Sequence, residues 1–226
     1  MRVWGMYMPE RDVPAVASMP AVSSRDRILL SAKHLFARNG YENSSTVAIA
    51  RDAGTSESQL MKHFGSKQGL LAAIFDRGWS NIIERVQTAS HANSPIERLM
   101  SMLDAIILEV ESDQELKELA ALEARRVRKD NRDVLISRGY QQFSEMMSGV
   151  LTEMRDQGHI RADLSLDAVR SAIMGMTEAL LRDQVVARRS ELRADYDTAD
   201  IRKLLDILIP SLNSDSSQPL KAVNER

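Results

Sequence analysis

The sequence predicts an all-α protein of about nine helices, in which a small N-terminal helix-turn-helix domain of three helices precedes a larger helical domain. Apolar residues recur at helical spacing from residue 24 to residue 212, and no segment shows the alternation that is typical of strands. Two short apolar-periodic segments, residues 49–53 and 60–64, flank a tight turn at Gly54, as in a helix-turn-helix. Serine-led capping patterns precede most of the apolar segments and favour the same class.

Helix starts and ends can be assigned in order along the chain. The pattern Ser23-x-x-Asp26 opens the first helix, which is expected to end at Gly40 because glycine tolerates the left-handed conformation. Ser94, Pro95 and Glu97 together open the fifth helix, and a ninth runs from about residue 198 to residue 212. The residues expected to cap the second to fourth and the sixth to eighth helices are Ser44 or Ser45, Ser56, Ser66, Ser112, Asn131 and Ser165.

The chain divides into four parts. Residues 1–21 hold three of the six prolines and no sustained period, so we expect a disordered arm, and we expect the same of the polar tail at residues 213–226. Residues 22–82 form the predicted helix-turn-helix domain and residues 83–212 the second helical domain. The apolar stripe from Leu71 to Val86 is too long for the small domain, so this helix is predicted to lead into the second.

The composition excludes several classes of function. There is no cysteine, which fits a reducing cytoplasm and excludes disulfides and thiolate ligands. The four histidines are scattered, so we expect no metal site and no cofactor. No apolar run approaches the roughly 18 residues of a membrane helix, so we expect a cytoplasmic protein without membrane association. The sequence also lacks a phosphate-binding glycine loop and a nucleophile motif, and therefore does not indicate an enzyme.

The net charge of −2 conceals an asymmetry between the two predicted domains. Residues 24–78 contain eight Lys/Arg and five Asp/Glu, whereas residues 79–226 contain twenty and twenty-five. Only the first part of the chain is therefore biased toward a polyanionic partner such as DNA.

The stretch from Arg25 to Leu71 resembles the TetR/AcrR family of bacterial transcription regulators. The resemblance covers about the first quarter of the chain after the arm, and Met61 departs from it because the family usually has a phosphate-contacting tyrosine there. The residues that match the family pattern in register are Ile28-Leu29, Ala32, Leu35-Phe36, Gly40-Tyr41, Ser44-Ser45, Ile49-Ala50, Ala53-Gly54, Ser56, Leu60, His63-Phe64, Ser66-Lys67 and Leu70.

The resemblance implies a DNA-binding regulator that acts as a homodimeric repressor. Paired recognition helices would read a pseudo-palindromic operator in double-stranded DNA, and a small ligand in the second domain would weaken that binding. The larger helical domain is accordingly expected to bind the effector and to dimerise.

Candidate DNA contacts fall into two groups. Phosphate contacts are expected from Lys62, His63 and Lys67, with Ser45 or Thr46 on the other side of the groove. Base readout is expected from Glu57, Ser58 and Gln59 at the start of the third helix. Alternatively, Glu57 could stabilise the helix N-terminus and Gln59 could complete a capping box. The complete set is Ser45, Thr46, Ser56, Glu57, Ser58, Gln59, Met61, Lys62, His63 and Lys67.

Methionines cluster in the seventh and eighth predicted helices. Such residues adapt their shape and could line a pocket for a flexible apolar effector, although the same stripe is also explained as ordinary core. An acyl or acyl-CoA compound whose charged end meets Arg125 or Arg126 is one candidate effector. The predicted lining is Trp79, Ile106, Arg125, Phe143, Met146, Met147, Met174 and Thr177.

Small residues follow one side of the eighth helix and allow close helix approach. They predict a four-helix dimer seam with the ninth helix, or alternatively packing inside the same subunit. The predicted interface is Ala168, Ala172, Gly175, Ala179, Leu205 and Leu208. A second class of function, a helical lipid-binding or adaptor module without DNA binding, stays open because of the departure at Met61.

Overall fold

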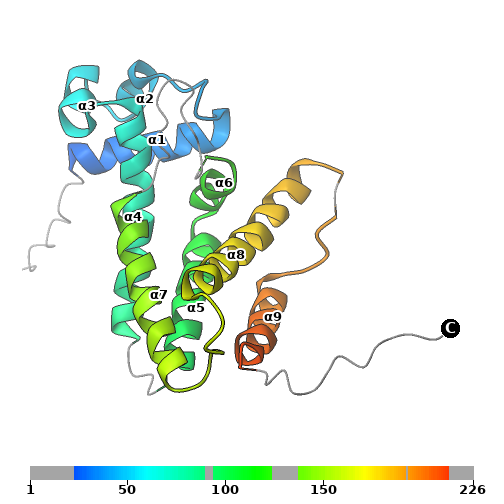
Figure 1. Ribbon diagram of the computed structural model, residues 1–226. Coiled ribbons are helices and arrows are strands. Elements are labelled where there is room, and N and C mark those ends of the chain that lie inside the picture. The colour runs from blue at the N-terminus through cyan, green and yellow to red at the C-terminus, as the bar shows by residue number, and fades with distance from the viewer. Residues whose placement is uncertain (1–22, 90–93, 124–136, 192, 214–226) are drawn as a thin grey trace, which may run out of the picture.

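The computed structural model describes residues 23–89, 94–123, 137–191 and 193–213. Within these ranges the protein is helical throughout and contains no strand, which confirms the predicted fold class (Figure 1). None of the described helices is long and apolar enough to cross a membrane. The helices are α1 (Ser24–Asn39), α2 (Thr46–Asp52), α3 (Glu57–Phe64), α4 (Lys67–Thr88), α5 (Pro95–Ser112), α6 (Gln114–Glu123), α7 (Arg138–Asp156), α8 (Leu166–Arg189) and α9 (Thr198–Ser211).

Most helix starts follow the predicted capping residues. At Ser45 the hydroxyl accepts the backbone N–H of Ala48, whereas the neighbouring Ser44 is buried and does not cap α2. Ser94 and Glu97 form the predicted capping box at α5, with Pro95 as the first helical residue. The other predicted serine caps that the structure confirms are Ser23, Ser56, Ser66 and Ser165.

Two predicted helix starts differ from the structure. Ser112 does not cap α6, because it is still the last residue of α5 and its hydroxyl donates to the Glu109 carbonyl. The cap is instead Asp113, whose carboxylate accepts the N–H of Leu116 at 3.0 Å. At α7 the cap is Ser137, while the predicted cap Asn131 lies outside the described residues.

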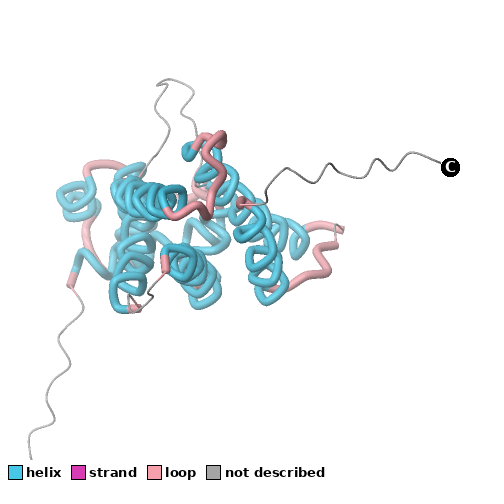
Figure 2. Tube along the Cα trace, turned by 60° about the horizontal axis from the view of Figure 1, so that its bottom comes forward, coloured by secondary structure: helices cyan, strands magenta, loops and turns pink. Residues whose placement is uncertain are grey.

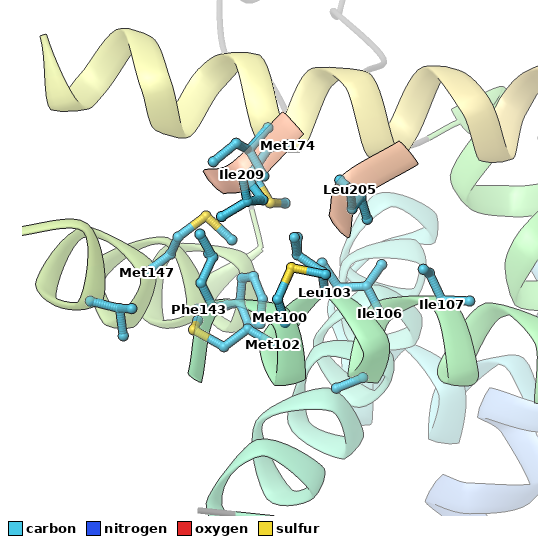
Figure 3. Packing of buried hydrophobic residues seen from close by; sticks show 14 of the residues in the cluster. Met100, Met102, Leu103, Ile106, Ile107, Phe143, Met147, Met174, Leu205 and Ile209 are labelled. Carbon is cyan, nitrogen blue, oxygen red and sulfur yellow. The ribbon is translucent and has the colours of Figure 1, made fainter. Parts of the chain in front are cut away.

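α4 joins two hydrophobic cores. Its first half contributes Leu70, Leu71, Ile74 and Phe75 to a core with α1, α2 and α3. Further along, Ile82 and Ile83 belong to a larger core, which also contains residues of α5, α7, α8 and α9 (Figure 3). Figures 1 and 2 show how the helices are arranged around these cores. The first three helices gather at one end of the molecule, and α4 runs away from them beside α7 and α5.

α6 belongs to the first core as well as to the second domain. Leu116 and Leu119 on α6 are buried among the residues of α1, α2, α3 and the first half of α4. The same helix packs against α8. The predicted boundary at residue 82 assigns α6 to the effector domain, whereas its apolar side chains help to complete the helix-turn-helix domain.

Gly139 lies at a close approach of the start of α7 to α4. Its backbone N–H donates to the Asp76 carboxylate at 3.0 Å, and a Cβ atom at this position would lie 2.4 Å from the Cβ of Trp79. We therefore expect Gly139→Ala to lower the free energy of unfolding by about 1–3 kcal/mol, measured by chemical denaturation.

Gly149 on the same helix provides the control for Gly139→Ala. No atom lies within 4 Å of a Cβ built there, so Gly149→Ala should raise the free energy of unfolding by about 0.5–1 kcal/mol through helix propensity alone. Equal denaturation midpoints for the two variants would contradict the close approach of α7 to α4.

Candidate functional site

α2 and α3 form a helix-turn-helix around Gly54. The φ angle of Gly54 is +63°, a left-handed conformation that glycine adopts without strain, which explains why glycine occupies the predicted turn. After the turn, the Ser56 hydroxyl caps α3 by accepting the N–H of Gln59 at 3.2 Å. Leu60 is the only buried residue of α3, and it belongs to the first core. Most of the remaining surface of this short helix is therefore presented to solvent at one end of the molecule (Figure 1).

Polar side chains connect the starts of α2 and α3. The Thr46 hydroxyl donates to a carboxylate oxygen of Glu57, the first residue of α3. At Gln59 the described contacts include the backbone N–H bond to Ser56 but no reciprocal side-chain bond that would complete a capping box. The exposed amide of Gln59 and the hydroxyl of Ser58 thus face outward from the first turn of α3.

The predicted phosphate-binding cations lie around the end of α3 and the start of α4. His63 lies with its Nε2 atom 3.3 Å from the Ser24 hydroxyl, whereas Lys62 is exposed. Lys67 is the first residue of α4, where its ammonium donates to the Glu42 carbonyl at 3.2 Å and lies 4.4 Å from the ring centroid of Tyr41. These contacts hold the Lys67 ammonium against the turn between α1 and α2.

An ion pair connects α1 to α4. Arg77 contacts Asp26 at 2.6 Å. The hydrogen bond from the Ser23 hydroxyl, followed by that from Arg77, holds the pKa of the Asp26 carboxyl below its ordinary value. Because both partners are largely exposed, we regard this pair as a contact that orients α1 rather than as a large source of stability.

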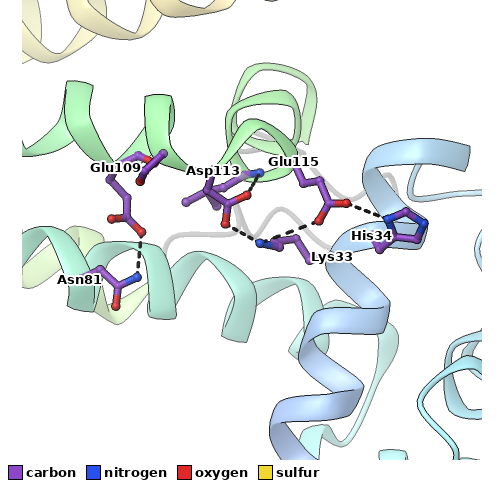
Figure 4. A network of polar contacts seen from close by, with 8 residues as sticks. Lys33, His34, Asn81, Glu109, Asp113 and Glu115 are labelled. Atoms are coloured by element: carbon purple, nitrogen blue, oxygen red, sulfur yellow. Dashed lines mark hydrogen bonds and ion pairs between the residues drawn. The ribbon is translucent and has the colours of Figure 1, made fainter.

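Polar contacts also connect the helix-turn-helix domain to the second domain (Figure 4). On α1, Lys33 pairs with Asp113, and His34 lies 2.7 Å from Glu115 of α6. Three residues further along α6, Glu118 pairs with Arg189 of α8. α6 is thus bound to the helix-turn-helix domain and to α8 at the same time.

A buried lysine extends this link. Lys117 of α6 donates to the Gln184 side chain of α8 at 2.7 Å. Burial, followed by the charge of Arg188, lowers the pKa of the Lys117 ammonium, and Glu111 acts in the opposite direction. The sequence analysis missed this role of α6, for which the only signal was a short amphipathic segment with acidic residues at its start.

A cavity of about 450 Å³ lies between the end of α4, the start of α5 and α7. Its apolar lining includes Val86, Met102, Met146 and Val150. At its polar end Arg98 pairs with Glu153, and the buried Nε of Arg98 has no hydrogen-bond partner among the described residues. An adjoining groove of about 640 Å³ between α4 and α5 shares Ala89 and Ser101 with this cavity and is lined mainly by polar side chains.

The predicted effector-pocket residues are not gathered around this cavity. Of the set, Met146 lines it, while Trp79 packs its ring 5.0 Å from that of Phe143 in the second core. Thr177 is buried with its hydroxyl donating to the Ile173 carbonyl, and Arg125 lies outside the described residues. The others, Ile106, Met147 and Met174, are buried core residues. Arg98 is the cavity cation that the sequence analysis did not select.

The predicted dimer residues of α8 lie at the surface. Ala168 and Ala172 are exposed, and Gly175 and Ala179 are half-buried. On α9, Leu208 is exposed, as are Leu204 and Ile207, which the sequence analysis did not place at the interface.

The dimer prediction is wrong for Leu205. Its side chain is fully buried in the core of its own subunit, where it packs with residues of α5, so a partner cannot reach it. The physical reason is that Ile201, Leu205 and Ile209 lie on one side of α9 at helical spacing and face inward together.

Two protein-family models match this chain, one over the helix-turn-helix domain and one over the second domain. The family model for bacterial regulatory proteins of the tetR family matches residues 28–74, and a model for the C-terminal region of the YsiA-like protein matches residues 75–205. A fatty acid metabolism regulator protein from Bacillus subtilis (strain 168) is 26% identical over 192 residues, which span 83% of this chain and 95% of that protein.

Solved structures show the same fold at low sequence identity. The fatty acid degradation regulator FadR from Bacillus halodurans gives a TM-score of 0.71 at 18% identity, covering 84% of this chain and 96% of that one. FadR from Bacillus subtilis in complex with stearoyl-CoA gives 0.69 at 21% identity, covering 82% and 97%. The helix-turn-helix and the two matched models together show that the chain belongs to the TetR family and is a DNA-binding transcriptional regulator.

Proposed function

We propose that the protein is a homodimeric repressor that places α3 in the major groove of a pseudo-palindromic operator. The observation that carries this proposal is the exposure of α3, which is held on the domain by Leu60 and presents polar and apolar side chains to solvent. A helix of this size fits the major groove, where base pairs display distinct donor and acceptor patterns.

The residues of the helix-turn-helix divide into positioning and reading roles. Lys62, His63 and Lys67 contact phosphates, and Ser45 and Thr46 do so at the start of α2. Ser58 and Gln59 read base edges, with the Gln59 amide suited to an adenine. Glu57 and Ser56 act mainly within the protein, since the Glu57 carboxylate accepts from Thr46 and the Ser56 hydroxyl caps α3.

Lys67 supplies a test of the phosphate contacts. Lys67→Ala should weaken binding to all duplexes alike and make the slope of log affinity against log salt shallower by about one unit. The measurement is a salt series of binding isotherms with several duplexes, and Arg155→Ala in the exposed last turn of α7 is the matched control. Loss of discrimination at one base position, with the slope unchanged, would show that Lys67 does not act through a phosphate.

Dimerisation is proposed to use the exposed faces of α8 and α9. Ala168 and Ala172 allow close approach of a second helix, and α9 exposes Leu204, Ile207 and Leu208. Small residues on one helix and exposed apolar side chains on another are both typical of helix-packing interfaces. A two-fold arrangement would present two copies of α3 to the two halves of an operator.

The effector is proposed to be a small apolar compound, with an acyl-CoA thioester as the leading class. The B. subtilis structure with stearoyl-CoA and the fatty acid regulator from the same species support this class. In this chain the cavity between α4, α5 and α7 offers apolar walls for an acyl chain, and Arg98 lies at its polar end.

Selection of genomic fragments by the purified full-length protein tests the DNA-binding proposal. We expect enrichment of a few fragments that share an inverted repeat, with protection of both half-sites in footprinting. The absence of any enriched fragment would overturn the repressor proposal and favour a helical lipid-binding or adaptor module.

A further inference from the structure

Two exposed apolar side chains on the helix-turn-helix lack a role in the contacts described above. Met61 in the middle of α3 is 41% exposed, and Val47 at the second position of α2 is 49% exposed. A single exposed apolar residue needs no explanation, but these two belong to the two helices that form the proposed DNA-reading surface.

Sequence position relates both residues to one contact between α2 and α3. Val47 follows Thr46, whose hydroxyl donates to Glu57. Met61 lies four residues, or one helical turn, after Glu57, and so projects from the same side of α3. We call Val47 and Met61 the apolar patch.

The chemistry of the patch limits what it can contact on DNA. Neither a thioether nor an isopropyl group can donate a hydrogen bond to a phosphate, and bringing either against a charged phosphate would only remove water from the anion. In the major groove the apolar group on a base edge is the C5-methyl of thymine. Methionine suits this contact because its long, unbranched side chain adapts to the position of the methyl group.

We infer that the apolar patch reads thymine C5-methyl groups in the operator, with Met61 contacting a thymine in the segment that α3 covers. This inference rests on the proposed function, because it assumes that α3 enters the major groove. Together with Gln59, which suits adenine, the patch gives α3 a preference for A·T pairs. The specificity of this chain therefore lies partly in the residue that departs from the family pattern.

Replacement of thymine by deoxyuridine isolates the proposed contact, because it removes only the C5-methyl group. The probe is the duplex obtained from the genomic selection, with each thymine replaced singly and then in both half-sites. For the wild-type protein we expect two positions per half-site, one for Met61 and one for Val47, each to lose about fourfold in affinity, and the symmetric double replacement of either position to lose roughly 10- to 20-fold. Met61→Ala should bind the thymine and deoxyuridine duplexes equally at the Met61 position.

Three further variants complete the test, and the first two keep it independent of folding and of general affinity loss. Met61→Leu retains an apolar side chain and should retain the preference for thymine. Lys62→Ala should weaken binding to both duplexes while leaving their ratio at the wild-type value. Val47→Ala is expected to remove the preference at a different thymine.

The outcomes separate this inference from the proposed function. If Met61→Ala weakens binding to both duplexes equally and keeps the wild-type ratio, Met61 contacts sugar or another group, and the thymine assignment is wrong. Wild-type affinity that is unaffected by deoxyuridine at every position would also overturn it. Failure to select any duplex would instead remove the proposed DNA binding, and the thymine assignment with it.

Discussion

Ile207→Glu is expected to convert the protein to a monomer and to weaken binding to the complete operator by roughly 10²- to 10⁴-fold. Ile207 is 68% exposed on α9 and adjoins Leu204 and Leu208 on the proposed dimer face. A carboxylate there would be buried without a partner in the dimer, which is costly, but stays solvated in the monomer. The measurements are light-scattering mass and operator affinity on the same preparation.

Leu108→Glu is the matched control for the dimer face. Leu108 is 52% exposed, but it lies on α5 at the groove between α4 and α5. The same change of charge there should leave both the mass and the operator affinity near the wild-type values. A dimeric Ile207→Glu variant would exclude this face of α9 as the interface.

Phe143→Ala is expected to lower the free energy of unfolding by about 3–5 kcal/mol, the largest effect on stability that we anticipate. Phe143 is fully buried in the second core, and its ring centroid lies 5.0 Å from that of Trp79. Truncation therefore removes apolar burial, an aromatic contact and packing between α4 and α7 in one step. Denaturant unfolding followed by helix circular dichroism gives the measurement.

Phe143→Leu separates cavity formation from other causes of instability. Leucine fills much of the same volume, so the loss should be clearly smaller than for alanine. If the alanine variant unfolded at the wild-type denaturant midpoint, Phe143 would not be part of a close-packed core.

Helix starts could be predicted from the sequence because capping depends on local chemistry. One side-chain oxygen and a backbone N–H three residues later suffice, so Ser56, Ser66 and Ser94 were identifiable from their neighbours alone. The choice between Ser44 and Ser45 was not local. The Ser44 hydroxyl donates to the carbonyls of Leu35 and Gly40, and the fold of the preceding turn settles that contact.

Packing partners could not be predicted in the same way. Leu116 and Leu119 are spaced to bury one face of α6, but this spacing fits either core and does not indicate that they join the first. α9 likewise carries apolar residues around more than half of its circumference, so periodicity puts Leu205 and Ile207 on different sides but does not indicate which side faces inward.

The candidate sites were predictable to different degrees. The helix-turn-helix residues are contiguous in sequence, so their common location follows once the motif is identified. The cavity brings together Val86, Arg98 and Met146 from three helices, and no local pattern relates such distant positions. Arg98 could not be distinguished from other surface arginines without the position of α7, which supplies Glu153.

Release of DNA by an acyl-CoA tests the central proposal most directly. The measurement is fluorescence anisotropy of a labelled operator duplex, bound by the wild-type protein and titrated with palmitoyl-CoA, with free CoA as the control. We predict that palmitoyl-CoA returns the anisotropy to that of free DNA, whereas free CoA leaves the complex intact. An anisotropy that stays at the bound value at every palmitoyl-CoA concentration would contradict the proposed effector response.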